Sequence, residues 1–496
     1  MARLHNPIRF FTDEELYAIH QTSLQILENP GIRIDHPEGL KLLQDAGAQV
    51  SYKDKVAKIP SHLMEEVMKK TRGDTWELHG TEHSVKIGGE DIIFMTYAGR
   101  IRDTRIIRFD GSCAYVLDLE AKERRIANSK DVVDGIRLND ALKNIRVVSF
   151  PVNDQTLAPE LRTVHGAADL VKNTTKPGGI DIFDVNEAKY VLRIAEAVAG
   201  GKEELRKKPI LTTFVELNSP LTIDDRTVDL IMMYTKEHLP IGISTMPITG
   251  LTGPCTLAGD LALANAEVWA GIGIAKLTDP DAPVQVFPGP DPLTYDMRTC
   301  SALYSGVERG MFYAGKIQLY AEFYNIPSGS TGFKADAPLP GIQATYEKLM
   351  SGLLPILAGA TEVGNIGYVD HNLTYSPEQT VLDCEMADMI DRVIRGIEVN
   401  EETLALDVIR QVGIKGNFLM HKHTSKHAKT EFWYPEFANR LYWDTWKKRG
   451  SKDILDAAKA KVESVLKTHD PKPLDRATEK EVDAIVKEAD LGLMRT

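Results

Sequence analysis

The chain has 496 residues, 43% of them hydrophobic, and can therefore bury one very large core or several ordinary ones. Its 59 Lys and Arg against 71 Asp and Glu leave a formal net charge of −12, which argues against nucleic-acid binding because that function needs clustered positive charge. No apolar run approaches the roughly 18 residues that a membrane span requires, so a membrane protein is not expected.

The N-terminal segment, residues 1–75, is expected to be mostly helical. Residues 12–27 carry apolar side chains at helical spacing, and Thr12 and Glu15 show the pattern of a capping box at their start. Two further helices are predicted over residues 36–46 and 61–70.

The cysteines and the first residues both indicate a cytoplasmic protein. Cys113, Cys255, Cys300 and Cys384 lie far apart without C-x-x-C spacing, which favours reduced thiols over a disulfide framework. Residues 1–11 lack a basic stretch followed by an apolar one, so they are not expected to form a signal peptide.

Residues 76–128 have the composition of β-hairpins packed on the main domain. Short β-branched and aromatic runs at residues 84–87, 91–97 and 115–117 alternate with Gly-Gly and Asp-Gly dipeptides. Such dipeptides favour the tight turns that join antiparallel strands.

From residue 129 to residue 450 the sequence alternates between apolar runs, polar or Gly/Pro loops, and amphipathic helices. Strands are expected over residues 145–150, 179–183, 210–215, 241–246, 284–287, 317–323 and 357–363. Helices are expected over residues 161–172, 186–199, 222–237, 257–275, 299–313 and 343–354. The strands are mostly apolar, as parallel strands covered on both faces should be.

With an eighth strand at residues 92–96, this alternation predicts an α/β protein built as a (β/α)8 TIM barrel. The small helical and hairpin segments precede the barrel, and residues 451–496 follow it as a charged helical tail. A doubly wound open sheet is the alternative, but neither G-x-G-x-x-G nor G-x-x-x-x-G-K-[ST] occurs, which disfavours a nucleotide-binding enzyme.

Barrel enzymes carry their sites in the loops after the strands, and those positions here combine aromatic residues with a few carboxylates and amides. The aromatic candidates are Tyr97, Phe214, Phe287 and Tyr324. The polar candidates are Glu216, Glu322, Asn365, His371 and Arg298. Aromatic faces attract quaternary ammonium groups, so this lining suits a bulky cationic ligand, although the same aromatics could simply form the barrel rim. No lysine in these positions looks desolvated, and no nucleophile elbow or H-E-x-x-H motif is present.

Three histidines, His421, His423 and His427, form the one cluster that could suggest a metal. His423 and His427 would share a helix face, but no thiolate or carboxylate stands at matching spacing. We therefore expect no metal site.

Several motifs resemble the trimethylamine methyltransferase superfamily over nearly the whole chain. They are Tyr115-Val116-Leu117-Asp118, Asn173-Thr174-Thr175-Lys176-Pro177, Asn218-Ser219-Pro220-Leu221, Met246-Pro247, Gly253-Pro254-Cys255-Thr256-Leu257-Ala258-Gly259, Gln343-Ala344-x-Tyr346-Glu347-Lys348, His423-Thr424 and Glu431-x-Trp433. The resemblance implies a corrinoid-dependent methyltransferase on a (β/α)8 barrel.

Superfamily members that act on trimethylamine carry a pyrrolysine in the stretch before the Gln343-Ala344 helix, whereas residues 327–342 here are all standard. Pro338 and Gly341 also depart from the pattern of many relatives. The chain thus resembles the non-pyrrolysine branch, typified by glycine betaine methyltransferase.

The resemblance implies transfer of a methyl group from a quaternary amine to a Co(I) corrinoid. The best candidate substrate is glycine betaine, which would give dimethylglycine. The chain has no D-x-H-x-x-G cobalamin signature, so we expect the corrinoid on a separate protein and none tightly bound here. A homo-oligomer is expected. The alternatives are a betaine-binding or sensing barrel without catalysis, and a barrel lyase with Glu216 or Glu322 as general base.

A betaine also carries a carboxylate, which needs donors if it is to be buried. Arg298 is the one arginine well placed by sequence, whereas His371 and Asn365, with the backbone amides of Gly364 and Gly367, would form a neutral alternative. We favour His371 with the backbone amides.

Overall fold

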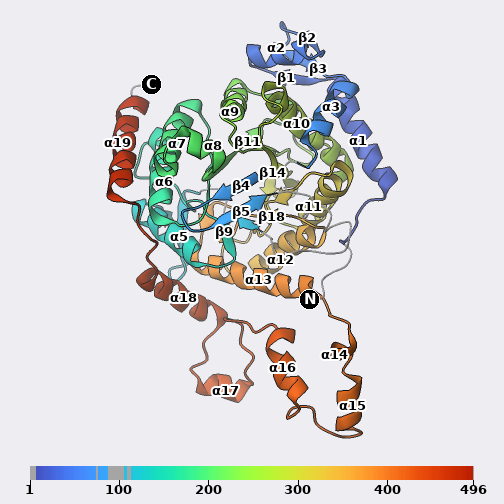
Figure 1. Ribbon diagram of the computed structural model, residues 1–496, viewed down its shortest axis with the longest axis vertical. Helices are drawn as coiled ribbons and strands as arrows, with labels where there is room; N and C mark the ends of the chain where they lie inside the picture. The colour runs from blue at the N-terminus through green and yellow to red at the C-terminus, as the bar shows by residue number, and fades with distance from the viewer. Residues whose placement is uncertain (1–6, 74–75, 88–105, 109–112, 495–496) are drawn as a thin grey trace.

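Parallel strands form the centre of the molecule and helices surround them (Figure 1). The computed structural model describes residues 7–73, 76–87, 106–108 and 113–494. The central strands are β6 (Ile106–Arg108), β9 (Ile145–Val147), β10 (Gly178–Gly179), β11 (Leu211–Leu217), β13 (Ile241–Thr245), β14 (Val284–Pro290), β17 (Gly329–Ser330) and β18 (Glu362–Val363).

These strands form two parallel sheets, in the orders β10-β11-β13-β14 and β17-β18-β6-β9. Isolated parallel bridges, Val148 with Gly178 and Val286 with Ser328, connect the two sheets at both ends. The alternation of parallel strands with helices confirms the predicted α/β fold.

Helices follow most of the strands, and five of them have bounds close to the predicted ones. The helices are α5 (Ser129–Ala141), α6 (Pro159–Asn173), α7 (Val185–Ala199), α8 (Lys202–Lys207), α9 (Asp225–Lys236), α10 (Leu257–Thr278), α11 (Val307–Gln318), α12 (Ile342–Leu357) and α13 (Pro377–Arg395). Residues 299–306, expected to be helical, instead include the short strand β16 (Ser301–Leu303), which pairs with β15 (Thr294–Asp296) as a hairpin beyond β14.

The predicted strand at residues 317–323 is wrong. These residues complete α11 and continue it as the π-helical turn η1 (Leu319–Tyr324). The segment is almost entirely buried, and a short apolar run buried on all sides has the same composition in a helix as in a strand. The strand that belongs to this part of the strand–helix alternation is β17. The other strand expected outside the regular series, residues 92–96, lies outside the described residues.

Alternation along β11 and β14 separates an outer face from an inner one. Val215 on β11 and Val286 on β14 belong to the main hydrophobic core with the helices. Because successive strand residues point to opposite faces, Phe214, Glu216 and Phe287 point inward. In register, Glu216 is paired with Ser244 of β13, which is paired with Gly289.

The N-terminal segment begins with α1 (Asp13–Glu28), and the predicted capping box between Thr12 and Glu15 is present. Next come α2 (Pro37–Asp45) and α3 (Ser61–Thr71), with β1 (Ile32–Ile34), β2 (Gln49–Ser51) and β3 (Val56–Lys58) between them; β1 also pairs with β12 (Thr222–Ile223). The segment packs on α10, which contacts both α1 and α3 (Figure 1).

The predicted hairpin is formed by β4 (Trp76–His79) and β5 (Ser84–Ile87), and lies against the N-terminal ends of the central strands. Leu78, Val85 and Ile87 pack with Val147 of β9. The amide of His79 donates to the carbonyl of Pro209, just before β11, at 2.8 Å. Figure 1 shows β4 and β5 across the middle of the helical ring. A second hairpin joins β7 (Tyr115–Asp118) to β8 (Glu123–Ile126), and β7 also pairs with β20 (Thr374–Tyr375), which follows β19 (Tyr368–Val369).

The C-terminal part has two portions. Residues 397–450, which we call the arm, extend away from the body, and their helices α14 (Glu401–Leu404), α15 (Leu406–Val412), α16 (Lys422–Glu431) and α17 (Trp443–Lys448) contain no buried residue (Figure 1). Beyond the arm, α18 (Ile454–Thr468) and α19 (Arg476–Leu493) return to pack on α5, α6, α7 and α13. In the part of the chain that the structure describes, no helix is long and apolar enough to cross a membrane.

Candidate active site

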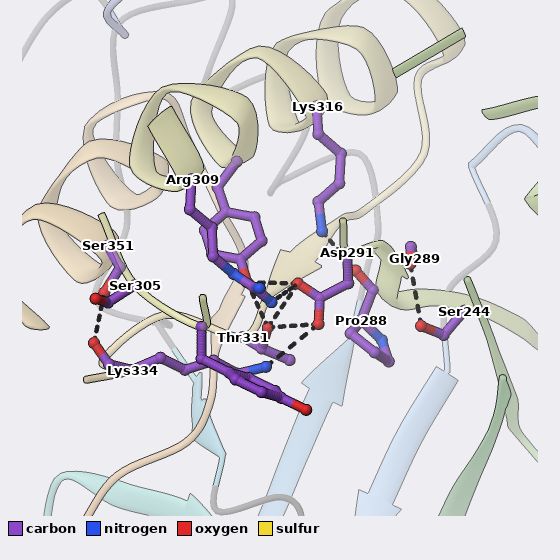
Figure 2. Close-up of polar contacts among 12 residues, drawn as sticks. Ser244, Pro288, Gly289, Asp291, Ser305, Arg309, Lys316, Thr331, Lys334 and Ser351 are labelled. Carbon is purple, nitrogen blue, oxygen red and sulfur yellow. Dashed lines mark hydrogen bonds and ion pairs between the residues drawn. The ribbon is translucent and has the colours of Figure 1, made fainter. Parts of the chain in front are cut away.

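Asp291, directly after β14, is the centre of a buried group of charged side chains at the C-terminal ends of the strands (Figure 2). Its Oδ1 accepts hydrogen bonds from Arg309 Nη2 at 2.6 Å, from the Tyr313 hydroxyl, and from Thr331 Oγ1 at 2.8 Å. Burial alone would raise the pKa of Asp291, but Arg309, Lys334 and Lys316 outweigh it and hold the pKa below its ordinary value. Asp291 is therefore a buried anion surrounded by cations.

Two of these cations come from α11. The side chain of Arg309 is fully buried, and its pairing with Asp291 raises its pKa even though burial alone would lower it. Lys316 is also buried and donates to the carbonyl of Pro288 at 2.5 Å. Burial lowers the pKa of Lys316 to about 7, with Asp291 opposing this change.

The third cation, Lys334, comes from the loop after β17. Its side chain is 5% exposed, its Nζ lies 3.4 Å from Asp291 Oδ2, and it stands 5.0 Å from the centre of the Tyr304 ring. Burial lowers the pKa of Lys334 to about 8, again against the influence of Asp291. At neutral pH the lysine is still mostly charged.

The loop that carries Lys334 is fixed to α12. Phe333, fully buried, has a left-handed backbone (φ 53°), and its carbonyl accepts from Lys348 Nζ at 2.5 Å. Glu347 accepts from the amides of Asp336 at 2.9 Å and Ala337 at 3.1 Å. A non-glycine residue in this region is strained, so the surrounding contacts hold the loop in one conformation.

Glu216 adds a second carboxylate near this group. Solvent reaches its side chain, yet protein surrounds it closely enough that burial raises its pKa to about 7. Asp291 raises this pKa further, whereas Lys334 and Arg309 lower it. Glu216 is therefore a carboxyl group that solvent can reach at the strand ends, and it can gain or lose a proton near neutral pH.

Phe214 and Phe287, both candidates from the sequence, face this interior. Each lies against a glycine of a neighbouring strand: a Cβ on Gly242 would stand 2.8 Å from the Cβ of Phe214, and one on Gly329 would stand 2.3 Å from Cδ2 of Phe287. The two glycines therefore make room for the two rings. Tyr97 lies outside the described residues.

Tyr324 and Glu322 were expected after a strand, and this expectation is wrong because the segment is helical. The Tyr324 hydroxyl accepts from Asn265 Nδ2 at 2.8 Å in the contact between η1 and α10. Glu322 pairs with Arg9 at 3.0 Å. Both side chains belong to the outer helical layer, away from the strand ends.

Arg298, proposed for the substrate carboxylate, is 88% exposed at the β15–β16 turn and bound to Asp296 at 2.7 Å. It takes no part in the buried group. The amides of Gly364 and Gly367, also proposed as donors, are already used by the carbonyl of Ser330 and by Asp383.

His371 and Asn365 both adopt left-handed backbone conformations. His371 Nδ1 lies 3.0 Å from Asp336, which also accepts from the amides of Tyr304 and Ser305. The histidine thus supports the loop that places Tyr304 over Lys334. Asn365 is buried directly after β18.

The sequence patterns do not identify Asp291, Arg309, Lys316 or Lys334, and the expectation that no lysine is desolvated is wrong, since Lys316 and Lys334 are buried. Thr331 and Lys334 would have been found if Gly329–Ser330 had been recognised as a strand. Asp291 directly follows the Phe-Pro-Gly-Pro segment, which the sequence indicates as a strand end, so its position there can be identified from the sequence.

The histidine cluster lies in the arm. His423 and His427 share a face of α16 as predicted, with ring centres 4.3 Å apart, and His427 Nε2 lies 3.0 Å from Glu402. Among the described residues, no group of three His, Cys, Asp or Glu side chains has a geometry that could hold a metal ion.

Sequence comparisons match the whole chain to methyltransferases. The family model described as trimethylamine methyltransferase (MTTB) matches residues 1–491. A trimethylamine methyltransferase of Desulfitobacterium hafniense is 33% identical over 482 residues, 97% of this chain and 94% of that relative. One of Methanosarcina barkeri is 33% identical over 488 residues, 97% and 95% of the two chains. A glycine betaine methyltransferase of D. hafniense is 29% identical over 489 residues, 98% of each.

The fold resembles that of a methyltransferase of known structure. The crystal structure of the Methanosarcina barkeri monomethylamine methyltransferase superposes with a TM-score of 0.51 at 12% identity, covering 100% of this chain and 90% of that one. At this identity the likeness concerns the fold alone.

Proposed function

Because the chain belongs to the trimethylamine methyltransferase (MTTB) family, we propose that it removes one methyl group from a quaternary amine. Glycine betaine is the leading substrate and dimethylglycine the product. In this proposal the two linked parallel sheets close into a (β/α)8 barrel, and the site lies at the C-terminal ends of its strands. The methyl group would be accepted by the Co(I) corrinoid of a separate protein, which would supply the electron pair for the new bond. The electron pair of the broken C–N bond would stay on nitrogen, and the substrate would leave as a neutral tertiary amine.

The observation that supports a quaternary amine is the placement of Glu216 and Phe214 on the same inner face of β11. A quaternary ammonium group has no N–H, so only charge and aromatic faces can hold it. A carboxylate that is largely enclosed, with an aromatic ring one inward position away on the strand, offers both. Enclosure also removes water from the reacting nitrogen, and a fixed cation needs only positioning for in-line transfer.

The choice within the family rests on composition rather than on identity. The relatives named for trimethylamine and for glycine betaine differ little in identity, at 33% and 29%. Residues 327–342 contain only standard residues, which suits the branch that needs no additional activating group. Of the two bases considered for a lyase, Glu322 is paired with Arg9 outside the strand ends.

A methyl-accepting partner needs a surface around the open end of the strands. Apolar side chains are exposed on loops and helix starts there: Leu251, Met297, Val307, Met311, Ile342 and Tyr346. Exposed apolar patches of this kind are typical of protein interaction sites. We assign this surface to the corrinoid protein.

The arm supports a homo-oligomer. Its side chains include Ile414, Met420 and Tyr442, each more than nine-tenths exposed, and its helices contain no fully buried residue in the single chain. Phe437 packs against the main core, but a segment that buries so little apolar surface cannot offset the entropy lost on ordering, so it needs a permanent contact. A second copy of the chain is always present in equal amount and supplies that contact.

The four free cysteines, two of them exposed, suit a cytoplasmic location.

The test is an absorbance assay in which the purified protein is mixed with free cobalamin reduced to Co(I) and with one amine at a time. We expect methylcobalamin to form from glycine betaine or a close quaternary analogue, with the dimethylamino product detected by mass spectrometry. Methylcobalamin formation from trimethylamine but from no quaternary amine would contradict the proposal.

A further inference from the structure

The charged group around Asp291 contains more hydrogen-bond donors than acceptors. Arg309, Lys316 and Lys334 bring three buried cations to one buried carboxylate, and Asp291 Oδ1 already receives Arg309, Tyr313 and Thr331. Lys316 donates a hydrogen bond of 2.5 Å to the Pro288 carbonyl, a much shorter contact than the one that Lys334 makes. The hydrogen-bond donors that lack a close acceptor therefore belong to Arg309 and Lys334.

Both residues have donors that the protein does not use. Arg309 Nη1 is buried and has no hydrogen-bond partner among the described residues. Lys334 has three ammonium protons, but its single hydrogen bond within the described chain is the long contact to Asp291 at 3.4 Å. Buried charged donors left in this state are costly unless a ligand meets them.

The unused donors are buried near Glu216, whose own side chain is exposed to solvent. Glu216, which solvent reaches, feels the charges of Lys334 and Arg309, and the half-buried ring of Tyr304 stands against the Lys334 ammonium. In Figure 2 the Lys334 side chain runs away from Ser351 and ends beneath Thr331, near Asp291 at the strand ends. A carboxylate and two cationic groups thus lie near one another at the strand ends.

The position of Lys334 is built in advance. Phe333 is held in a strained conformation, and three side chains of α12, those of Glu347, Lys348 and Ser351, bind the backbone of residues 333–337. Preorganised groups bind a ligand without an added ordering cost.

We propose that Lys334, supported by the charge of Arg309, binds a carboxylate of the substrate, while Glu216 and Phe214 receive its ammonium group. This inference rests on the proposed function and narrows it: the substrate is a zwitterion, a quaternary amine with a carboxylate close to the nitrogen. Simple alkylammonium ions and choline lack the group that Lys334 needs. Lys334 is a specificity residue in this arrangement, because it touches the substrate away from the methyl group that leaves.

The test compares glycine betaine with choline by titration calorimetry in the full-length protein. Lys334→Met keeps the length of the side chain and removes the charge, so glycine betaine should bind about 10- to 100-fold more weakly while choline binding stays the same. Lys334→Gln, which keeps a neutral donor, should fall between wild type and Lys334→Met. If only one variant folds, as judged by circular dichroism, that variant decides.

Lys316→Met is the matched control. It removes a lysine amino group from the same cluster, but that amino group is bound to the Pro288 carbonyl, so the ratio of betaine to choline affinity should not change. An equal loss for both ligands in Lys334→Met, or an unchanged betaine affinity, would overturn the inference. The same would follow if Lys316→Met altered the ratio as much as Lys334→Met.

These results are separable from a failure of the proposed function. If wild type transfers a methyl group from glycine betaine to cobalamin but Lys334→Met keeps the affinity ratio, only the carboxylate site is wrong. If wild type uses no quaternary amine, the function is wrong, and binding of dimethylglycine still tests the carboxylate site: a 10-fold or greater loss in Lys334→Met supports it and no loss overturns it.

Discussion

Arg309 Nη2 lies 2.6 Å from Asp291 Oδ1, and this buried ion pair joins the end of β14 to the first turns of α11. Thr331 and Lys334 bring the loop after β17 to the same carboxylate. One side chain therefore holds three segments that are separate in sequence. The position of the positive charges at the strand ends depends on it.

Asp291→Asn should strongly destabilise the protein, since it leaves Arg309 and its neighbours buried without their anion. Loss of one partner of a buried pair costs about 3–5 kcal/mol. Denaturant unfolding followed by circular dichroism measures the change. Asp296→Asn is the control, because its partner Arg298 is 88% exposed at a turn and is not left buried without an anion, so the unfolding midpoint should change little. Equal effects of the two substitutions would show that the buried pair is not needed.

Binding should depend on pH through Glu216. Its pKa is about 7 in the free protein, so below pH 7 the carboxyl is increasingly protonated and loses its attraction for a fixed cation. Choline affinity should fall by up to about tenfold per pH unit on the acid side. Glycine betaine should show a second decline above about pH 8, where Lys334 loses its proton. Asp291 and Arg309, the other charges that act on Glu216, stay ionised across this range.

Titrations from pH 5.5 to 9 with both ligands check this expectation. In Glu216→Gln the acid decline should disappear for both ligands, and affinity at pH 8 should be lower than in wild type. A decline at high pH that choline shares with glycine betaine would argue against Lys334 as its source.

The two inward aromatic rings should contribute to cation binding. Phe214→Leu and Phe287→Leu keep apolar volume but remove the ring face, so affinity for glycine betaine and choline alike should fall by about 0.5–2 kcal/mol. Tyr324→Phe, in the outer helical layer, should leave affinity unchanged and lower stability through loss of its bond to Asn265. Unchanged affinity in both leucine variants would place the cation elsewhere.

The arm should mediate self-association. Replacing Leu419 and Met420 together by Glu places charges on two of its most exposed apolar positions and should shift the protein toward a monomer. Light scattering coupled to size-exclusion chromatography gives the mass. Tyr17→Glu, at an exposed position on α1, serves as the control and should keep the wild-type mass. A monomeric wild-type protein would refute the prediction outright.

Features that depend on neighbouring residues could be predicted from the sequence, whereas features that depend on contacts between distant segments could not. The capping box of Thr12 and Glu15 lies within one helical turn, so the start of α1 could be predicted from spacing alone. Residues 317–323 were misassigned because burial on every side removes the periodicity that separates helix from strand. Lys334 was missed because β17 has only two residues, and Asp291 because its partners come from segments that only folding brings together.

The β4–β5 hairpin has a consequence for the kinetics. Because it lies against the N-terminal ends of the strands, the amine and the methyl acceptor must reach the site from the same side. The amine then has to enter before the acceptor protein docks, and the demethylated product leaves only after that protein has departed. Initial-rate measurements should therefore show a compulsory order of addition, with excess acceptor protein inhibiting the reaction by blocking amine entry.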